Sequence, residues 1–206
     1  MTKMRTLGVV VGTAALALAA VPVLAQDDAE MMAEPIEVGG VEYAFTELPT
    51  SVPAGTEVTL RNDGAEVHEI FIMRVADDVT ESFEELMAMG EEAMAAGKVV
   101  PVSEAPLIVM PGETSEGSIA LPQEGRHVAI CFVPQGVIPE DLAALGITDL
   151  GPDMDVSGLS PEAQEYVAAL DEAPPHFVLG MVQEFTVTAA GTEVGPLPEP
   201  MEDEAA

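Results

Sequence analysis

Positive charge is scarce in this sequence. The 206 residues include six Lys and Arg against 37 Asp and Glu, which gives a formal net charge of −31 at pH 7. A field of this sign repels nucleic acid and anionic lipid, so neither is expected as a partner. Two interpretations of the acidity remain open: a solvated surface suited to a salty medium, or a surface that steers a basic partner protein.

Cysteine is nearly absent, because Cys131 is the single one in the chain. An internal disulfide is therefore excluded. In an oxidising compartment a lone thiol is a liability unless it is buried, paired with another chain or bound to a metal. Cys131 is accordingly a candidate metal ligand, with a buried and inert cysteine as the alternative.

Several functional motifs are also missing. The sequence contains no phosphate-binding loop, no Ser–His–acid order, no zinc-ligand spacing and no internal repeat. The acidic pairs at residues 84–85 and 91–92 fit a solvated helix face, and nothing beside them suggests acid–base catalysis. Beyond residue 25, no run of about twenty apolar residues predicts a membrane anchor.

Residues 1–25 have the form of a secretory signal peptide. Lys3 and Arg5 precede an apolar run over residues 7–20, and small residues at 23–25 form the cleavage sequence. We therefore expect an exported protein, periplasmic or extracellular after the signal peptide is removed. Removal of the two basic residues makes the mature chain still more acidic.

Short alternating segments separated by Pro and Gly turns predict an all-β fold. The fold class that we expect is a Greek-key β-sandwich with two helical insertions. The strands are predicted at residues 41–46, 56–61, 67–75, 107–110, 117–121, 125–132 and 182–188. The domain plan is a signal peptide (1–25), a flexible lead-in (26–36), the β-domain (37–190) and a disordered acidic tail (191–206).

The first insertion, at about residues 77–98, has a helical period. It predicts one helix that begins at Asp78 or Thr80 and ends at Gly97. One face of this helix would carry Phe83, Leu86, Met87, Gly90 and Met94.

The second insertion, at about residues 135–174, predicts two helices. The first covers residues 139–145, and the second begins at an N-capping Ser160 followed by Pro161 and ends near Asp171.

Four side chains in the β-domain are of the types that hold a mononuclear copper ion: His68, Cys131, His176 and Met181. Thiolate and thioether ligands favour Cu(I), whereas imidazole tolerates both oxidation states. Cys131 ends one predicted strand and Met181 precedes the next, so antiparallel pairing would place both at one end of the sandwich. The short spacing from His176 to Met181 lets one loop return to the metal.

The segments around these residues resemble the cupredoxins, the blue copper proteins of the plastocyanin and azurin type. Residues 61–69 (RNDGAEVHE) resemble the segment that carries the first histidine ligand, and residues 125–131 (GRHVAIC) resemble the strand that ends in the cysteine. Residues 176–187 resemble the histidine–methionine loop and the last strand. The resemblance covers most of residues 36–188, apart from the two insertions.

The resemblance implies one type 1 copper ion, with His68, Cys131 and His176 as ligands and Met181 in the axial position. It also implies one-electron transfer with a redox partner protein. No enzymatic activity is expected, because a single such centre lacks the second copper cluster that oxidases need. An apolar collar around His176 would form the docking surface; its members are Pro174, Pro175, Phe177, Val178 and Leu179.

The chain departs from the family pattern at two places. The family usually places its second histidine two to four residues after the cysteine, whereas 44 residues lie between Cys131 and His176. Pro134 and the Pro174–Pro175 pair bracket this insertion. We therefore predict that the chain leaves the sandwich and returns to it at the end where the candidate copper ligands lie. His127 stands where the family commonly has a core aromatic residue, and we predict a core residue rather than a ligand.

The sequence leaves two other functions open. One is copper delivery or storage outside the cytoplasm, through a more open site that prefers Cu(I). The other is a sandwich without metal that acts as a binding module, with the insertions as its recognition face. A further hypothesis is a methionine-rich Cu(I) site formed by Met87, Met89, Met94 and Met110. Methionines on the buried face of a helix are the favoured interpretation.

Overall fold

The computed structural model describes residues 33–148 and 155–199. The predicted signal peptide, most of the predicted lead-in and residues 200–206 lie outside the described residues. Among the described helices, none has the length and apolar character needed to cross a membrane.

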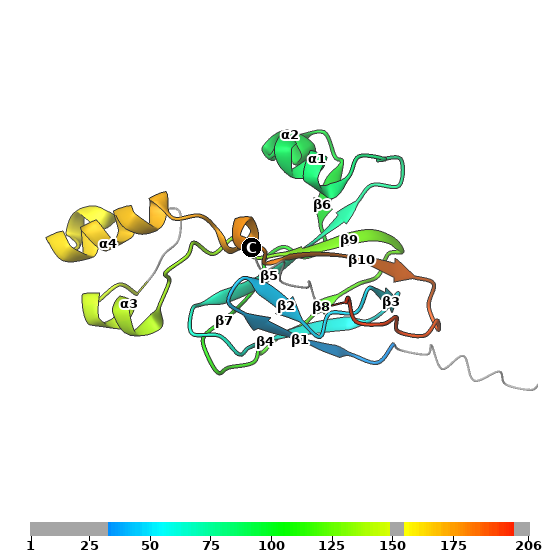
Figure 1. Cartoon of the computed structure of the whole chain (residues 1–206), viewed down its shortest axis with the longest axis horizontal. Coiled ribbons are helices and arrows are strands. Elements are labelled where there is room, and N and C mark those ends of the chain that lie inside the picture. Colours follow the sequence, from blue (N-terminus) through cyan, green and yellow to red (C-terminus); the bar gives the residue numbers. More distant parts are fainter. Residues whose placement is uncertain (1–32, 149–154, 200–206) are drawn as a thin grey trace, which may run out of the picture.

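The described strands form two sheets that face each other (Figure 1). In the first sheet the order is β2 (Ala44–Thr46), β1 (Ile36–Val41), β4 (Glu57–Asn62) and β8 (Ile119–Ala120). Strands β1 and β4 are parallel, and the other neighbours in this sheet are antiparallel.

The second sheet carries the elements that reach the candidate site. Its order is β3 (Ser51–Pro53), β10 (Val182–Thr188), β9 (Gly125–Ile130), β5 (His68–Val75) and β6 (Val99–Pro101), and β7 (Leu107–Val109) pairs with the start of β5. Strands β10, β9 and β5 are antiparallel neighbours. The predicted β-rich sandwich is confirmed, and its Greek-key connectivity stays a prediction.

Strand β5 is apolar on both faces because both faces are covered. Ile70 and Ile72 point into the core between the sheets, where they meet Leu60 from the first sheet. Met73 and Val75 point the other way and pack against the helices of the first insertion. The same alternation in β9 places Ala129 in the core between the sheets.

The first insertion forms two short helices, α1 (Phe83–Met89) and α2 (Glu91–Ala95), rather than the single predicted helix. Gly90, with φ of 56°, interrupts the helical backbone between them. The N-cap is Ser82, not Asp78 or Thr80, because Ser82 and Glu85 complete a reciprocal capping box.

Both helices lie over the outer face of the second sheet (Figure 1). Leu86 and Ala93 are their buried contacts with this face. Met94 is 47% exposed, so its predicted place on the buried face is wrong. The break at Gly90 changes the direction of the chain and leaves Ala93 in the inward position.

The second insertion projects from one end of the sandwich (Figure 1). It comprises α3 (Pro139–Leu145), the 3-10 turn η1 (Val156–Gly158) and α4 (Pro161–Glu172). The Ser160 hydroxyl accepts a hydrogen bond from the Ala163 amide at 3.2 Å, so the predicted cap is confirmed. Val137 and Leu170 pack on Val67, which fastens the base of the insertion to the start of β5.

Residues 41–46 form a hairpin instead of the single strand predicted there. Val41 pairs with Ala44 across a turn in which Tyr43 has φ of 63°. In a single strand Val41 and Phe45 would share one face, whereas in the hairpin Phe45 pairs with Gly40 and lies on the other face from Val41. Alternation over six residues does not reveal the turn that reverses the chain. The turn brings Tyr43 to the end of the sandwich where the candidate ligands lie.

The segment after β10 is attached to the domain. Residues 191–199 lack regular structure, but the Gly195 amide donates to the Ser51 carbonyl at 2.8 Å and the Thr50 amide donates to the Pro196 carbonyl at 2.8 Å. Gly195 and Pro196 of the predicted disordered tail are therefore fastened beside the start of β3.

Candidate metal centre

Three polar side chains meet inside one end of the sandwich. His68 begins β5, Cys131 directly follows β9, and His176 begins the 3-10 turn η2 (His176–Leu179). One ligand atom from each lies within 4.8 Å of the others, and all three residues are fully buried. Residues far apart in sequence thus form one compact cluster.

The distances in this cluster suit a shared metal ion. His68 Nδ1 and His176 Nδ1 are 3.1 Å apart, and Cys131 Sγ lies 3.5 Å from His176 Nδ1. Atoms that bind one ion at about 2.0 to 2.3 Å lie about 3 to 4 Å from each other. Two imidazole nitrogens and a sulfur at these separations therefore fit a single ion.

The long insertion does not separate the ligands, because its two ends meet. Pro134 and Pro175 form an antiparallel bridge, and the His176 amide donates to the Val133 carbonyl at 2.8 Å. The excursion predicted for residues 135–174 therefore leaves and re-enters the sandwich at one point.

Met181 lies beside the same cluster and is fully buried. Its carbonyl accepts a hydrogen bond from the Cys131 amide at 3.2 Å, and its amide donates to the His176 carbonyl at 2.9 Å. A Cβ atom on Gly40 would lie 3.2 Å from Met181 Cε and 3.5 Å from His68 Cδ2, so the thioether chain and the His68 ring share one neighbour. The structure thus brings all four predicted ligands to one place.

The sulfur of Cys131 is held in a buried and polar setting. The Glu69 amide points at Sγ from 3.4 Å, and the Glu69 carboxylate accepts a hydrogen bond from the Phe132 amide at 2.8 Å. Burial raises the pKa of the Cys131 thiol to about 12. The metal-free site therefore contains a neutral thiol, and a metal ion must displace its proton to bind the sulfur.

His68 is neutral in the metal-free protein. Burial, followed by the nearby His176, lowers the pKa of His68 to about 4. Its Nε2 atom is buried without a hydrogen-bond partner among the described residues. A neutral imidazole has a lone pair to offer, so His68 needs no deprotonation to act as a ligand at neutral pH.

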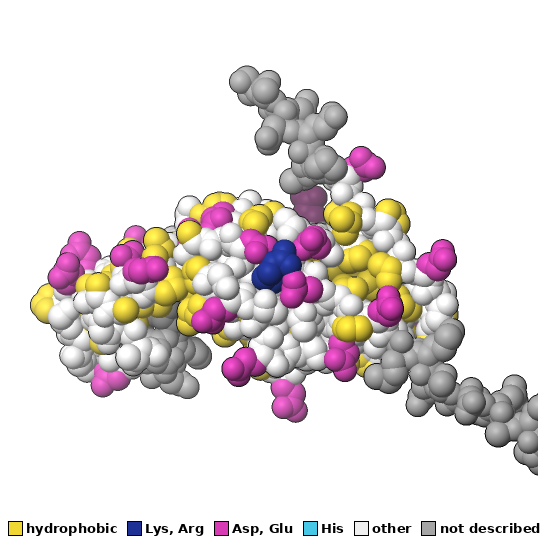
Figure 2. Space-filling model, turned by 90° about the horizontal axis from the view of Figure 1, so that it is seen from below, with side chains coloured by type: hydrophobic (Ala, Val, Ile, Leu, Met, Phe, Trp, Pro, Cys, Tyr) yellow, Lys and Arg dark blue, Asp and Glu magenta, His cyan; other side chains and the backbone are white. Residues whose placement is uncertain are grey.

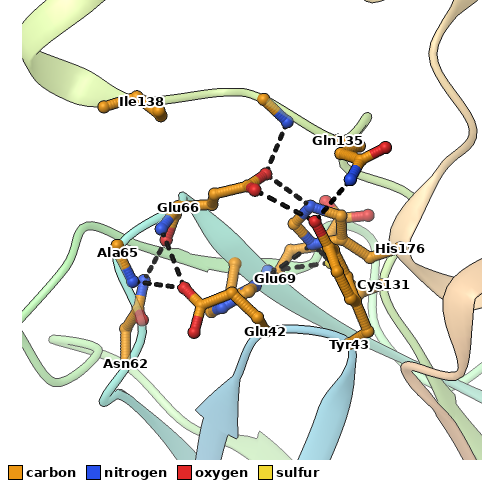
Figure 3. Close-up of polar contacts among 12 residues, drawn as sticks. Glu42, Tyr43, Asn62, Ala65, Glu66, Glu69, Cys131, Gln135, Ile138 and His176 are labelled. Carbon is orange, nitrogen blue, oxygen red and sulfur yellow. Dashed lines mark hydrogen bonds and ion pairs between the residues drawn. The ribbon is translucent and has the colours of Figure 1, made fainter.

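His176 is fixed by residues whose role the sequence does not predict (Figure 3). Its Nε2 atom lies 3.1 Å from Glu66 Oε2. Glu66 in turn accepts hydrogen bonds from the Tyr43 hydroxyl at 3.1 Å and from the Gly136 amide. Glu66 lies in the segment that resembles the first-histidine motif but is not the ligand of that segment, and Tyr43 lies outside the ligand segments. Their approach to His176 depends on the β1–β2 turn and on the base of the insertion.

His127 is a core residue, as predicted. It is buried, its Nδ1 atom contacts the Gly125 carbonyl oxygen at 3.0 Å, and its ring centroid lies 5.5 Å from that of Phe185. The methionines of the first insertion form no comparable site: Met87 and Met89 pack against the second sheet, while Met94 is exposed.

Comparison with known proteins found no matching family model and no matching curated relative. Among solved structures, dithionite-reduced auracyanin from Roseiflexus castenholzii is similar with 19% identity over 75% of this chain and 96% of its own, at a TM-score of 0.38. Auracyanin A, a "blue" copper protein from Chloroflexus aurantiacus, is 24% identical over 49% of this chain and 88% of its own, at a TM-score of 0.33. A purple cupredoxin from Nitrosopumilus maritimus is 19% identical over 46% of this chain and 84% of its own, at a TM-score of 0.28.

The chain resembles the cupredoxins. The resemblance consists of the β-rich sandwich together with the cluster of two imidazoles and one thiol and its neighbouring thioether. This donor set is consistent with one type 1 copper ion.

Proposed function

We propose that this protein is an exported electron carrier that holds one type 1 copper ion with His68, Cys131, His176 and Met181. The observation that carries the proposal is the convergence of one nitrogen from each of two imidazoles and the Cys131 sulfur within 4.8 Å in a fully buried cluster. Copper bound there supplies a one-electron couple, because soft sulfur ligands suit Cu(I) and imidazoles suit both oxidation states.

The chain supports this role by holding its ligands in place. A backbone hydrogen bond just beyond the ends of β9 and β10 joins Cys131 to Met181, and another backbone hydrogen bond joins Met181 to His176. The Glu69 amide restrains the sulfur. A site that is fixed before the electron arrives needs little rearrangement when the charge changes.

Burial of the cluster favours electron transfer over copper delivery. His68, Cys131 and His176 are all 0% exposed, so a donor or acceptor of copper ions has no direct access to them. An electron, unlike an ion, passes through a thin protein layer.

Apolar side chains next to Cys131 and His176 in the chain reach the surface. Phe132, next to Cys131 in the chain, is 41% exposed and contacts Phe177 with ring centroids 5.4 Å apart. Val178 and Leu179 of the predicted collar are also exposed. Such a surface excludes water on contact and suits short-lived docking.

Acidic side chains are distributed over the remaining surface. Figure 2 shows them spread over one face, with basic side chains at a single position among them. With a formal charge of −31, the protein would attract a basic redox partner over a long range. We propose such a partner, and we propose no enzymatic activity.

The test is to add one equivalent of Cu(II) to the copper-free protein. We expect an intense visible thiolate-to-copper band that ascorbate bleaches and a mild oxidant restores. Cys131→Ser should lose the band, whereas His127→Phe, which alters a buried histidine outside the cluster, should retain it. A colourless wild type that binds no copper would overturn electron transfer and leave the metal-free binding module.

Export is tested separately. The signal peptide predicts that the mature protein begins at Gln26 and occurs outside the cytoplasm. N-terminal sequencing of the native protein after cell fractionation checks both points, and a cytoplasmic protein that retains residues 1–25 would contradict them.

A further inference from the structure

We propose that Glu66 is a positioning residue for the copper site: it holds the outer nitrogen of His176, turns the inner nitrogen toward the ion, and favours Cu(II) over Cu(I). The inference rests on the proposed function. It concerns the nitrogen of His176 that faces away from the cluster.

The contact between Glu66 and His176 is sheltered from solvent. Oε2 of Glu66 lies 3.1 Å from His176 Nε2, where the side chains are 12% and 0% exposed. A hydrogen bond from an imidazole to a carboxylate is stronger in such surroundings than at the surface, because little water competes for either partner.

Glu66 is itself held from several sides. The Tyr43 hydroxyl donates to Oε1 at 3.1 Å, and the Gly136 amide donates to Oε2. The Asn62 side-chain amide donates to the Glu66 carbonyl at 2.8 Å. These hydrogen bonds hold the Glu66 side chain and backbone with the carboxylate directed at His176 (Figure 3).

This contact selects the imidazole tautomer that binds metal. An Nε2–H that donates to Glu66 leaves the lone pair of His176 on Nδ1. Nδ1 is the atom that faces His68 Nδ1 at 3.1 Å and Cys131 Sγ at 3.5 Å. Carboxylate partners orient metal-binding histidines in this way and increase their basicity.

The negative charge of Glu66 also affects the equilibrium between Cu(II) and Cu(I). A carboxylate hydrogen-bonded to a ligand ring stabilises the more positive ion, so Cu(II) gains relative to Cu(I) and the reduction potential falls. Because Gly136 belongs to the second insertion, the insertion supplies part of this arrangement. The second insertion therefore contributes a hydrogen bond to the arrangement that holds His176.

The test compares Glu66→Gln with Glu42→Gln. Each substitution removes one carboxylate charge near the cluster, but the Glu42 carboxylate accepts from the Ala65 and Glu66 amides and makes no hydrogen bond to His176. Both variants should bind one copper ion and keep the visible band. In Glu66→Gln we expect at least a tenfold shift of relative affinity toward Cu(I), which for one electron is a rise of about 59 mV in potential.

Glu42→Gln should shift the potential by less than half as much. An equal shift in both variants, or none in Glu66→Gln, would overturn the specific role of Glu66 while leaving the copper site intact. Failure of the wild type to bind copper would overturn both this inference and the proposed function.

A second measurement uses the copper-free protein. Nitrogen NMR of labelled histidines should show His176 as the Nε2–H tautomer in the wild type and in Glu42→Gln. In Glu66→Ala, both tautomers should appear. Retention of the single tautomer in Glu66→Ala would overturn the positioning role whether or not copper binds.

Discussion

Pro134 and Pro175 lie opposite each other in an antiparallel bridge at the neck of the second insertion. The next residue pair is hydrogen-bonded as well, because the Gln135 amide donates to the Pro174 carbonyl at 3.0 Å. Cys131 and His176 lie on the other side of this neck. The two ends of the insertion are thus held side by side next to the candidate site. The length of the insertion therefore has no bearing on the distance between Cys131 and His176.

Removal of the insertion should therefore preserve copper binding. Replacing residues 136–173 with Asn-Gly would close the bonded pair Gln135 and Pro174 with a two-residue hairpin turn. We expect the shortened chain to bind one copper ion with the visible band retained. A shortened protein that folds, as judged by its far-ultraviolet circular dichroism, but stays colourless would show that the insertion is needed to bring the ligands together.

The absence of a side chain at Gly64 leaves room for the His68 ring. A Cβ atom there would lie 2.6 Å from His68 Nε2 and 2.5 Å from Glu42 Oε1, and both distances are shorter than van der Waals contact. Gly64→Ala should displace the His68 ring and lower copper affinity at least tenfold, measured by competition with a copper chelator. Gly117→Ala is the matched control, because its nearest neighbour would be Leu107 Cδ2 at 3.9 Å; equal affinities in the two variants would contradict the account.

His127 should make stability depend on pH. Burial, opposed by the Gly125 carbonyl and assisted by Arg74, lowers the pKa of His127 below its ordinary value of 6.5. The unfolded chain therefore takes up the proton first, so this residue lowers the free energy of unfolding as pH falls from 6.5 toward the lowered native pKa.

His127→Phe should flatten that part of the profile. The variant also removes the Nε2 atom, which is buried without a partner among the described residues, and retains an aromatic ring beside Phe185. Urea unfolding of the copper-free wild type and variant at several pH values between 4 and 7 measures the difference. Parallel profiles would show that His127 does not titrate in this range.

The acidity of the chain should appear in its reaction rates. We expect the rate constant for electron exchange with a basic cytochrome to fall steeply as ionic strength rises, because salt screens the attraction between opposite net charges. An acidic cytochrome is the control and should react faster as salt is added. Stopped-flow absorbance of the visible band follows both reactions, and a rate with the basic protein that is independent of salt would rule out steering.

The sequence predicts the position of most strands and the residues of the cluster, because both are encoded locally. A continuous apolar segment identifies β5, and side-chain chemistry identifies Cys131 and His176 as ligand types. The predicted core role of His127 follows from the alternation of side chains along a strand, since His127 and Ala129 lie on one face of β9.

The parts that the sequence does not predict depend on tertiary contacts. Glu66 acquires its role when the insertion brings Gly136 to it and the β1–β2 turn brings Tyr43. The break at Gly90 depends on how α2 reaches the second sheet, which a helical period alone cannot encode. A pattern of residue types is therefore sufficient for the ligands but insufficient for the residues that hold them.

X-ray absorption at the copper edge tests the central claim most directly, namely that Cys131 and His176 bind the same ion across the insertion. The copper-loaded wild type should show one sulfur and two nitrogen neighbours at about 2.0 to 2.3 Å. Cys131→Ser should lose the sulfur, and His176→Gln should lose one nitrogen. A wild-type spectrum with oxygen and nitrogen neighbours but no sulfur would contradict the account.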